Sequence, residues 1–238
     1  MRLEKFAVNN YVHVYNRGNR KMTIFNDEED RWRFLLILRY FNSKNSPIKT
    51  FQELFFLKQT NQCDLFEWPK KWQSPDPLVK IISYCLMPNH YHLLLQEIVA
   101  GGIRTFMQKL GVGFTNYSNT KYGESGRIFQ GPYKAKVIGS EEYLQYVSAY
   151  IQVFNPFELL DGGSDAAFEK FDKAFKNALD YQFCSLGESF NRRNLSIIDK
   201  DFAIKKFPTL EKYKEFAKNS FLKKDPTGAY KNACIDAV

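Results

Sequence analysis

Two apolar runs joined by a proline constrain the fold of this chain more than any other feature. The runs extend from Leu78 to Leu86 and from His90 to Glu97, and Pro88-Asn89 lies between them. Both runs are typical of β-strands, and because proline donates no backbone hydrogen bond, the boundary belongs at that dipeptide. Side chains alternate across a strand, so we expect His90 and His92 to lie on one face of the sheet.

The opposite face of the second strand carries Tyr91, Leu93 and Leu95, and it is apolar enough to pack against helices. Two imidazoles side by side on one face suit a divalent metal ion. Two ordinary polar positions on a half-exposed strand explain the same pattern, because His-x-His is a short motif. Spacing alone therefore leaves both interpretations open.

Composition narrows the class of protein. The 238 residues are 44% hydrophobic and 16% aromatic, which allows a packed core and argues against disorder. The chain carries 34 Lys and Arg against 26 Asp and Glu, which gives a net charge of +8. This surplus favours a polyanionic partner, most often nucleic acid, although a merely basic protein has the same charge.

Four scattered cysteines without a C-x-x-C pair argue against a thiolate zinc site and against a disulfide framework. The first ten residues lack an apolar signal core, and no run of about 18 apolar residues is present to span a membrane. We therefore expect a cytoplasmic protein with no membrane partner.

The remaining strand and helix signals give the order β-α-insertion-β-β-α-β-α. They predict a strand at Tyr11 to Tyr15, a helix from Asn26 or Asp27 to about Asn42, a helix from Ile103 to Thr120, a strand at Tyr133 to Ile138, and a helix from Ser140 to about Phe154 that Asn155-Pro156 ends. This order predicts an α+β fold, a ferredoxin-like antiparallel sheet with helices on one face.

Residues 1–160 should form this domain, with an insertion at about 43–77 in which Thr50 to Lys58 suit a strand or a helix equally well. Residues 161–238 should form a lysine-rich, helical C-terminal extension, with amphipathic segments at 203–207 and 210–221.

The helix that begins at Ser140 carries Tyr143, Tyr146 and Tyr150 on one face, at positions i, i+3 and i+7. An aromatic stripe at helical spacing is usually part of the core. A phenol hydroxyl is also a nucleophile that can form a covalent intermediate. Combined with a histidine pair and a basic charge, the stripe suggests metal-assisted phosphoryl transfer on DNA.

Four segments of the chain form a recognisable series. They are Tyr11-Val-His-Val-Tyr-Asn-Arg-Gly-Asn-Arg, Tyr84-Cys-Leu-Met-Pro-Asn-His-Tyr-His-Leu-Leu-Leu, Gly126-Arg-Ile-Phe-Gln-Gly-Pro-Tyr-Lys-Ala, and Tyr143-Leu-Gln-Tyr-Val-Ser-Ala-Tyr-Ile followed by Asn155-Pro156. In this order and at these gaps the segments resemble the single-tyrosine HUH transposases, and within them the REP-associated tyrosine transposases. Apart from the insertion, the resemblance covers about Tyr11 to Pro156.

This resemblance implies a dimeric, ferredoxin-like nuclease and strand transferase that acts on single-stranded DNA, often beside a hairpin. His90 and His92 match the pair that holds Mg²⁺ or Mn²⁺ in the family. Tyr150 matches the catalytic tyrosine, which attacks phosphorus and leaves a 5′-phosphotyrosine link and a free 3′-OH. Neutral imidazoles bind such hard cations only when phosphate oxygens complete the shell, so metal and DNA should bind together.

One spacing departs from the family pattern. The family tyrosine usually lies four residues before an asparagine that can supply a third metal ligand. Here Asn155 lies five residues after Tyr150, and Phe154, which cannot coordinate, takes the fourth position. Either a bulge in the helix restores the geometry, or Asn155 only ends the helix, or the site is degenerate. Asn155 is the best candidate for the third ligand, and Gln152 should face away from Tyr150.

Cations beside turns and aromatic residues are candidates for DNA contact. The candidates are Arg17, Arg20 and Lys21 after the first strand, and Arg127, Tyr133, Lys134 and Lys136 before and within the last. The first group suits phosphates, although a solvated turn explains it equally well. The second group interleaves charges with a ring, which suits unpaired bases and backbone. His13 is explained as well by a hydrogen bond within the sheet as by a place in the active site.

Two rival functions remain open. A catalytically inactive, sequence-specific DNA hairpin-binding protein derived from such an enzyme would explain Phe154. A metallohydrolase of small substrates would need a third strong ligand, which only His13 or a carboxylate could supply.

Overall fold

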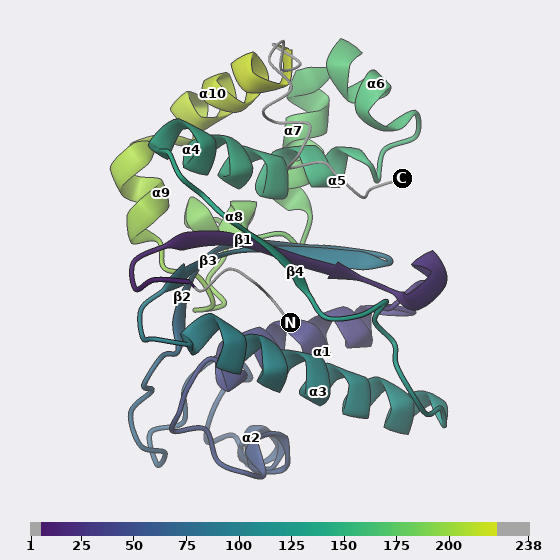
Figure 1. The fold of residues 1–238 in the computed structure, drawn as a ribbon, viewed down its shortest axis with the longest axis vertical. Helices are drawn as coiled ribbons and strands as arrows, with labels where there is room; N and C mark the ends of the chain where they lie inside the picture. Colours follow the sequence, from purple (N-terminus) through teal and green to yellow (C-terminus); the bar gives the residue numbers. More distant parts are fainter. Residues whose placement is uncertain (1–5, 223–238) are drawn as a thin grey trace.

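A central antiparallel sheet lies between two layers of helices in the computed structural model, which describes residues 6–222 (Figure 1). The strands within these residues are β1 (Tyr11–Arg17), β2 (Val79–Met87), β3 (His90–Glu97) and β4 (Lys134–Val137), in the spatial order β2-β3-β1-β4. Every neighbouring pair is antiparallel. The predicted α+β class and antiparallel sheet are confirmed.

One face of the sheet packs against helices α1 (Glu28–Phe41) and α3 (Gly102–Tyr122). Tyr91, Leu93 and Leu95 all belong to this core, as the alternation along β3 predicts. A capping box fixes the start of α1, because the Asp27 carboxylate accepts from the Asp30 backbone N–H while the Asp30 side chain accepts in return. The helix therefore begins after Asp27 rather than after Asn26.

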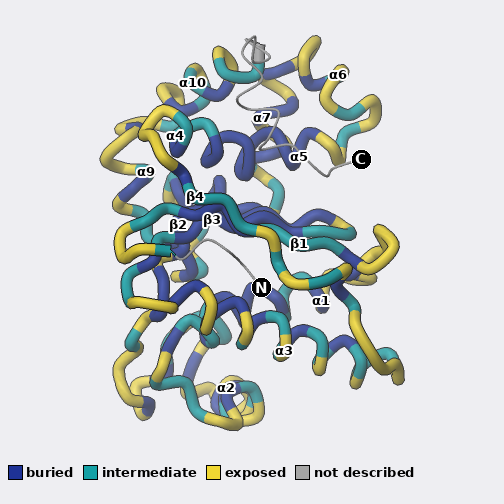
Figure 2. The backbone as a smooth tube through the Cα atoms, viewed as in Figure 1, coloured by how far each residue is buried: buried dark blue, intermediate teal, exposed yellow. Residues whose placement is uncertain are grey.

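The second face of the sheet is covered as well. Helix α4 (Glu141–Ala149) leads into the π turn η2 (Tyr150–Phe154) and the short helix α5 (Asn155–Phe157). The helices that follow along the chain are α6 (Gly163–Glu169), α7 (Phe171–Asp180), α8 (Leu186–Ser189), α9 (Asp201–Lys206) and α10 (Leu210–Leu222). Helices were predicted on one face of the sheet, and the structure has them on both. The second face is covered because it is itself apolar, with Cys85, Met87 and Leu94 in a second core. Figure 2 shows most of β2 and β3 as buried, while β4 is intermediate or exposed.

This second core joins residues on both sides of position 160, among them Val147 in α4 and Tyr213 in α10. The division of the chain into 1–160 and 161–238 therefore remains a prediction. The predicted lysine-rich helices correspond to α9 and α10, and residues 223–238 lie outside the described residues. Among the helices of residues 6–222, none has the length and apolar character needed to cross a membrane.

The segment predicted as an insertion forms helix α2 (Thr50–Gln59) and a loop. Residues 50–58, whose sequence suited a strand or a helix equally well, are therefore helical. Leu54 and Trp72 from this segment pack against Leu36 and Tyr40 of α1 in a small separate core. The Tyr40 hydroxyl donates to backbone carbonyls of the loop at 2.8 and 2.9 Å. The segment thus extends the α1 side of the molecule and leaves the histidine face untouched.

Candidate functional site

His90 and His92 lie on the same face of β3, with ring centroids 5.2 Å apart and ring planes nearly perpendicular. This face is the one covered by α4 and η2. His90 is half-buried, and the His92 side chain is buried. The two imidazoles therefore lie next to each other on one face of the strand, as the spacing predicts.

Hydrogen bonds fix which nitrogen of His90 is available. Its Nδ1 lies 2.7 Å from the Asn89 side-chain oxygen, an acceptor, so Nδ1 carries the proton and donates. The lone pair is then on Nε2, which is buried and has no hydrogen-bond partner among residues 6–222. A buried, unpaired imidazole nitrogen is costly unless something binds it, and metal ligands typically have this arrangement.

His13 on β1 contacts the second histidine directly. Its Nε2 lies 2.9 Å from Nδ1 of His92, both side chains are buried, and the two rings stack with centroids 5.1 Å apart. When His92 donates its Nδ1 proton to His13, the lone pair of His92 is on Nε2, as metal binding requires. The sequence left open whether His13 serves the sheet or the site, and the structure places it against a proposed ligand.

Burial keeps all three imidazoles neutral at physiological pH. It lowers the pKa of His13 to about 3, with a further contribution from Lys136, and that of His90 to about 4, with a contribution from Arg17. The pKa of His92 falls well below its ordinary value, again chiefly through burial. Neutral imidazole is the form that binds metal ions.

These depressed pKa values predict a stability that falls as the solution is acidified from about pH 6.5 to 4. In that window the unfolded chain binds protons that the folded chain does not, so each imidazole lowers the free energy of unfolding by about 1.4 kcal/mol per pH unit. Replacing His13→Gln should make the slope shallower by about that amount. Urea titrations at half-unit pH steps measure both slopes, and equal slopes would show that His13 is not buried neutral.

Tyr150 completes the cluster from the same chain. Its ring centroid lies 5.5 Å from that of His92 and 6.0 Å from that of His13, edge-on to both. The side chain is 5% exposed. The predicted nucleophile therefore meets His92 of the histidine pair, which lies 58 residues earlier in the sequence, and also His13.

The helix is bulged at this tyrosine. Tyr150–Phe154 form a π turn, and the backbone N–H of Asn155 donates to the carbonyl of Tyr150, five residues earlier. In a π turn five residues make approximately one turn, so Tyr150 and Asn155 have the relation that residues four apart have in an α-helix. Asn155-Pro156 does not end the helix as expected, because the chain continues to Phe157. A proline is tolerated there, in the first turn after the regular hydrogen-bond pattern is interrupted.

Asn155 is fully buried, and neither its side-chain oxygen nor its nitrogen has a hydrogen-bond partner among the described residues. Two unsatisfied amide atoms in the interior are costly, and both remain available to a ligand. Residues 6–222 contain no group of three or more His, Cys, Asp and Glu side chains that could hold a metal ion. A site built on the histidine pair thus needs a ligand of another type, and the metallohydrolase hypothesis lacks its third strong ligand.

Three of the predicted DNA contacts lie on strands beside the histidines. Arg17 pairs with His90 across the β1–β3 ladder, and its Nε donates to Gln130 at 2.9 Å. Lys134 and Lys136 pair with Tyr15 and His13 across the β1–β4 ladder. Arg20 and Lys21 lie exposed in the turn after β1, where the Asn89 side chain donates to the Lys21 carbonyl at 3.1 Å.

The remaining two candidates lie beside a groove. Arg127 and Tyr133 line a groove of about 480 Å³ between α3 and the loop that precedes β4. This loop is joined to the end of β1, where the Gln130 backbone N–H donates to the Arg17 carbonyl at 2.9 Å. The cations therefore follow β1 and its neighbouring loops from the groove to the histidine face.

Residues 67–153, which include both strand histidines and Tyr150, match the family model described as "Transposase IS200 like", and this match confirms the resemblance found in the sequence. The chain is also similar to a solved structure titled "Structure of the REP associates tyrosine transposase bound to a REP hairpin". The identity is 11% and the TM-score 0.41, over 82% of this chain and 88% of that chain. No curated protein matches the chain.

Proposed function

We propose that this chain, whose residues 67–153 match the IS200-like transposase family model, cleaves and rejoins single-stranded DNA through a covalent link to Tyr150. The observation that carries the proposal is the contact between the Tyr150 and His92 rings, 5.5 Å apart at their centroids. A phenol and a pair of neutral imidazoles meet beside a row of cations, which is the set of groups that tyrosine-mediated phosphoryl transfer requires.

In the proposed reaction the Tyr150 hydroxyl attacks the scissile phosphorus. An O–P bond forms to the tyrosine oxygen and the P–O3′ bond breaks, so one DNA end keeps a 5′-phosphotyrosine link and the other a free 3′-OH. The tyrosine proton passes to water, and the departing 3′ oxygen takes up a proton. Attack by another 3′-OH reverses the step and rejoins the strands without ATP.

His90, His92 and Asn155 would hold Mg²⁺ or Mn²⁺. When bound, the ion polarises the phosphate and stabilises its developing charge. Nε2 of His90 and the side-chain oxygen of Asn155 support this assignment, since both are buried without a hydrogen-bond partner within residues 6–222. Imidazole is a weak ligand for these cations, so phosphate oxygens would complete the coordination shell.

Single-stranded DNA with a hairpin is the proposed partner. Its phosphates and unpaired bases would contact Arg17, Arg20, Lys21, Arg127, Tyr133, Lys134 and Lys136. The proposal is supported by the places of Arg17, Lys134 and Lys136 on β1 and β4 and of Arg127 and Tyr133 beside the groove. A homodimer is proposed from the family resemblance.

The test is incubation with a single-stranded DNA hairpin and Mg²⁺, followed by denaturing electrophoresis. A covalent protein–DNA band is expected, and removal of the metal by EDTA should lower its yield by at least about a hundredfold. The alternative, a catalytically inactive sequence-specific hairpin-binding protein, predicts binding without a covalent band. A band undiminished by EDTA would contradict the metal role of the histidines.

A further inference from the structure

Gln152 lies in the middle of the π turn Tyr150–Phe154. Its side chain is 2% exposed, and its amide group bonds to residues of the C-terminal extension, far along the chain. Nε2 donates to the hydroxyls of Ser185 and Ser189 at 2.8 and 2.7 Å. Oε1 accepts from the Tyr213 hydroxyl at 2.8 Å. Both amide protons and the carbonyl oxygen are thus used within the interior.

These partners are themselves fixed. Ser185 is tied to the sheet, because its hydroxyl accepts from the Tyr84 backbone N–H at 2.9 Å and its own N–H donates to the Tyr84 carbonyl at 2.9 Å. Ser189 lies in α8, and Tyr213 lies in α10. One amide side chain therefore connects the π turn to β2, α8 and α10.

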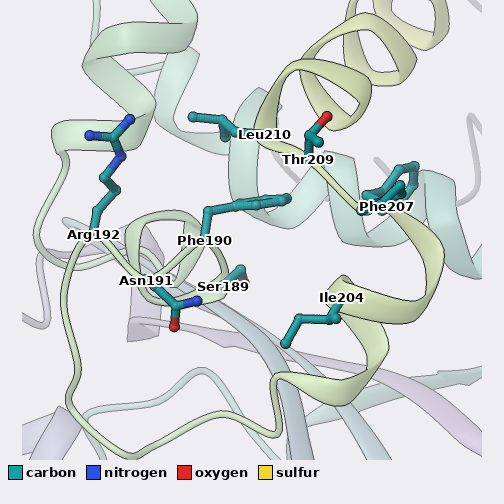
Figure 3. A pocket seen from close by; sticks show the side chains of 9 residues that line it. Ser189, Phe190, Asn191, Arg192, Ile204, Phe207, Thr209 and Leu210 are labelled. Carbon is teal, nitrogen blue, oxygen red and sulfur yellow. The ribbon is translucent and has the colours of Figure 1, made fainter.

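The Tyr213 ring is held by two phenylalanines of the extension. Its centroid lies 5.3 Å from that of Phe190 and 4.8 Å from that of Phe207. Both phenylalanines line a pocket of about 240 Å³, with Ser189 beside them, where α8, α9 and α10 meet (Figure 3). Burial raises the pKa of Tyr213, so its hydroxyl remains protonated and able to donate. The donor to Gln152 is therefore immobilised by the extension.

We propose that Gln152 is a positioning residue through which the C-terminal extension holds the π turn in register, so that Tyr150 meets His92 and Asn155 lies one turn beyond it. This inference rests on the proposed function of Tyr150. The register decides which residue follows Tyr150, because the same sequence wound as a regular α-helix would place Phe154, instead of Asn155, one turn after it. A buried polar network with every group satisfied specifies one arrangement over its alternatives.

Two variants in two elements of the extension test the proposal. Tyr213→Phe removes one donor to Gln152, and Ser189→Ala removes one acceptor, while the reacting groups stay unchanged. Tyr40→Phe is the matched control, because Tyr40 is also fully buried and its hydroxyl also donates to the interior, but on the α2 side of the sheet. All three proteins keep the full chain.

The first measurement separates positioning from binding. With saturating hairpin DNA and Mg²⁺, the rate of adduct formation should fall about tenfold or more in both test variants, while the Kd for DNA stays unchanged. The control should keep the wild-type rate. Rates in the test variants equal to that of the control would overturn the proposal.

The second measurement does not depend on activity. Hydrogen exchange of peptides covering residues 150–157 should be faster in both test variants than in the wild type and unchanged in the control. Unchanged exchange in the test variants would overturn the positioning role. If the wild type forms no adduct at all, the proposed function of Tyr150 fails, and hydrogen exchange still decides whether Gln152 holds the turn.

Discussion

Phenylalanine in place of Tyr150 is expected to abolish the covalent protein–DNA adduct, lowering its rate of formation at least about a thousandfold. The substitution removes only the attacking oxygen. The ring keeps its edge-on contacts with His92 and His13, so folding and DNA binding should be preserved. The adduct is measured with labelled hairpin DNA on denaturing gels, and the Kd by electrophoretic mobility shift.

Tyr146→Phe is the control for this experiment. Tyr146 lies on the same helix, one turn before Tyr150, and is the alternative nucleophile by position. Its ring contacts Phe154, with centroids 6.0 Å apart. Retained adduct in the Tyr146 variant, together with loss in the Tyr150 variant, supports the assignment. The reverse pattern would transfer the nucleophilic role to Tyr146.

The second large effect is expected for His90→Ala. Removing one of two imidazole ligands should weaken Mn²⁺ binding in the presence of DNA at least about tenfold and slow adduct formation about a hundredfold or more. His90 is preferable to His92 for this test, because His92 is the more deeply buried and contacts His13. Free Mn²⁺ is followed by electron paramagnetic resonance.

Gln96→Ala provides the comparison. Gln96 lies on the same strand and the same face, two pleats beyond His92. Its loss should change neither Mn²⁺ affinity nor the rate of adduct formation. Equal effects of the two alanine variants would mean that the strand, and not the imidazole, is what the reaction requires.

Local sequence pattern was enough to predict the histidine pair and the opposite apolar face. Alternation along β3 places His90 and His92 together and sends Leu93 and Leu95 to the helices, because a strand has a period of two. Helix signals were similarly sufficient for α1, α3 and α4. Short-range rules fix these features, since the interacting residues are neighbours along the chain.

Contacts between distant segments could not be read in the same way. The His13–His92 hydrogen bond depends on the β1–β3 register, and no local pattern specifies that register. The covering of the second sheet face depends on how the C-terminal helices dock, and Cys85 and Leu94 alone do not reveal it. The contact of His13 with His92 could therefore be seen only in the folded structure.

The π turn lies between these two cases. The five-residue interval from Tyr150 to Asn155 raised a bulge as one of three explanations, and the structure contains one. Sequence alone could not select it, because the hydrogen bonds that Gln152 makes from within the bulge go to residues far along the chain, and no local pattern specifies them. The surroundings here include Ser185, Ser189 and Tyr213, all more than 30 residues away.

The proposed reaction depends most directly on which tyrosine oxygen becomes attached to DNA. Trypsin releases residues 137–170 as one peptide, which contains Tyr143, Tyr146 and Tyr150. Mass spectrometric fragmentation of this peptide from the purified adduct, after nuclease trimming, should locate the nucleotide 5′-phosphate on Tyr150. A phosphate on Tyr143, on Tyr146 or on a peptide outside residues 137–170 would contradict the account.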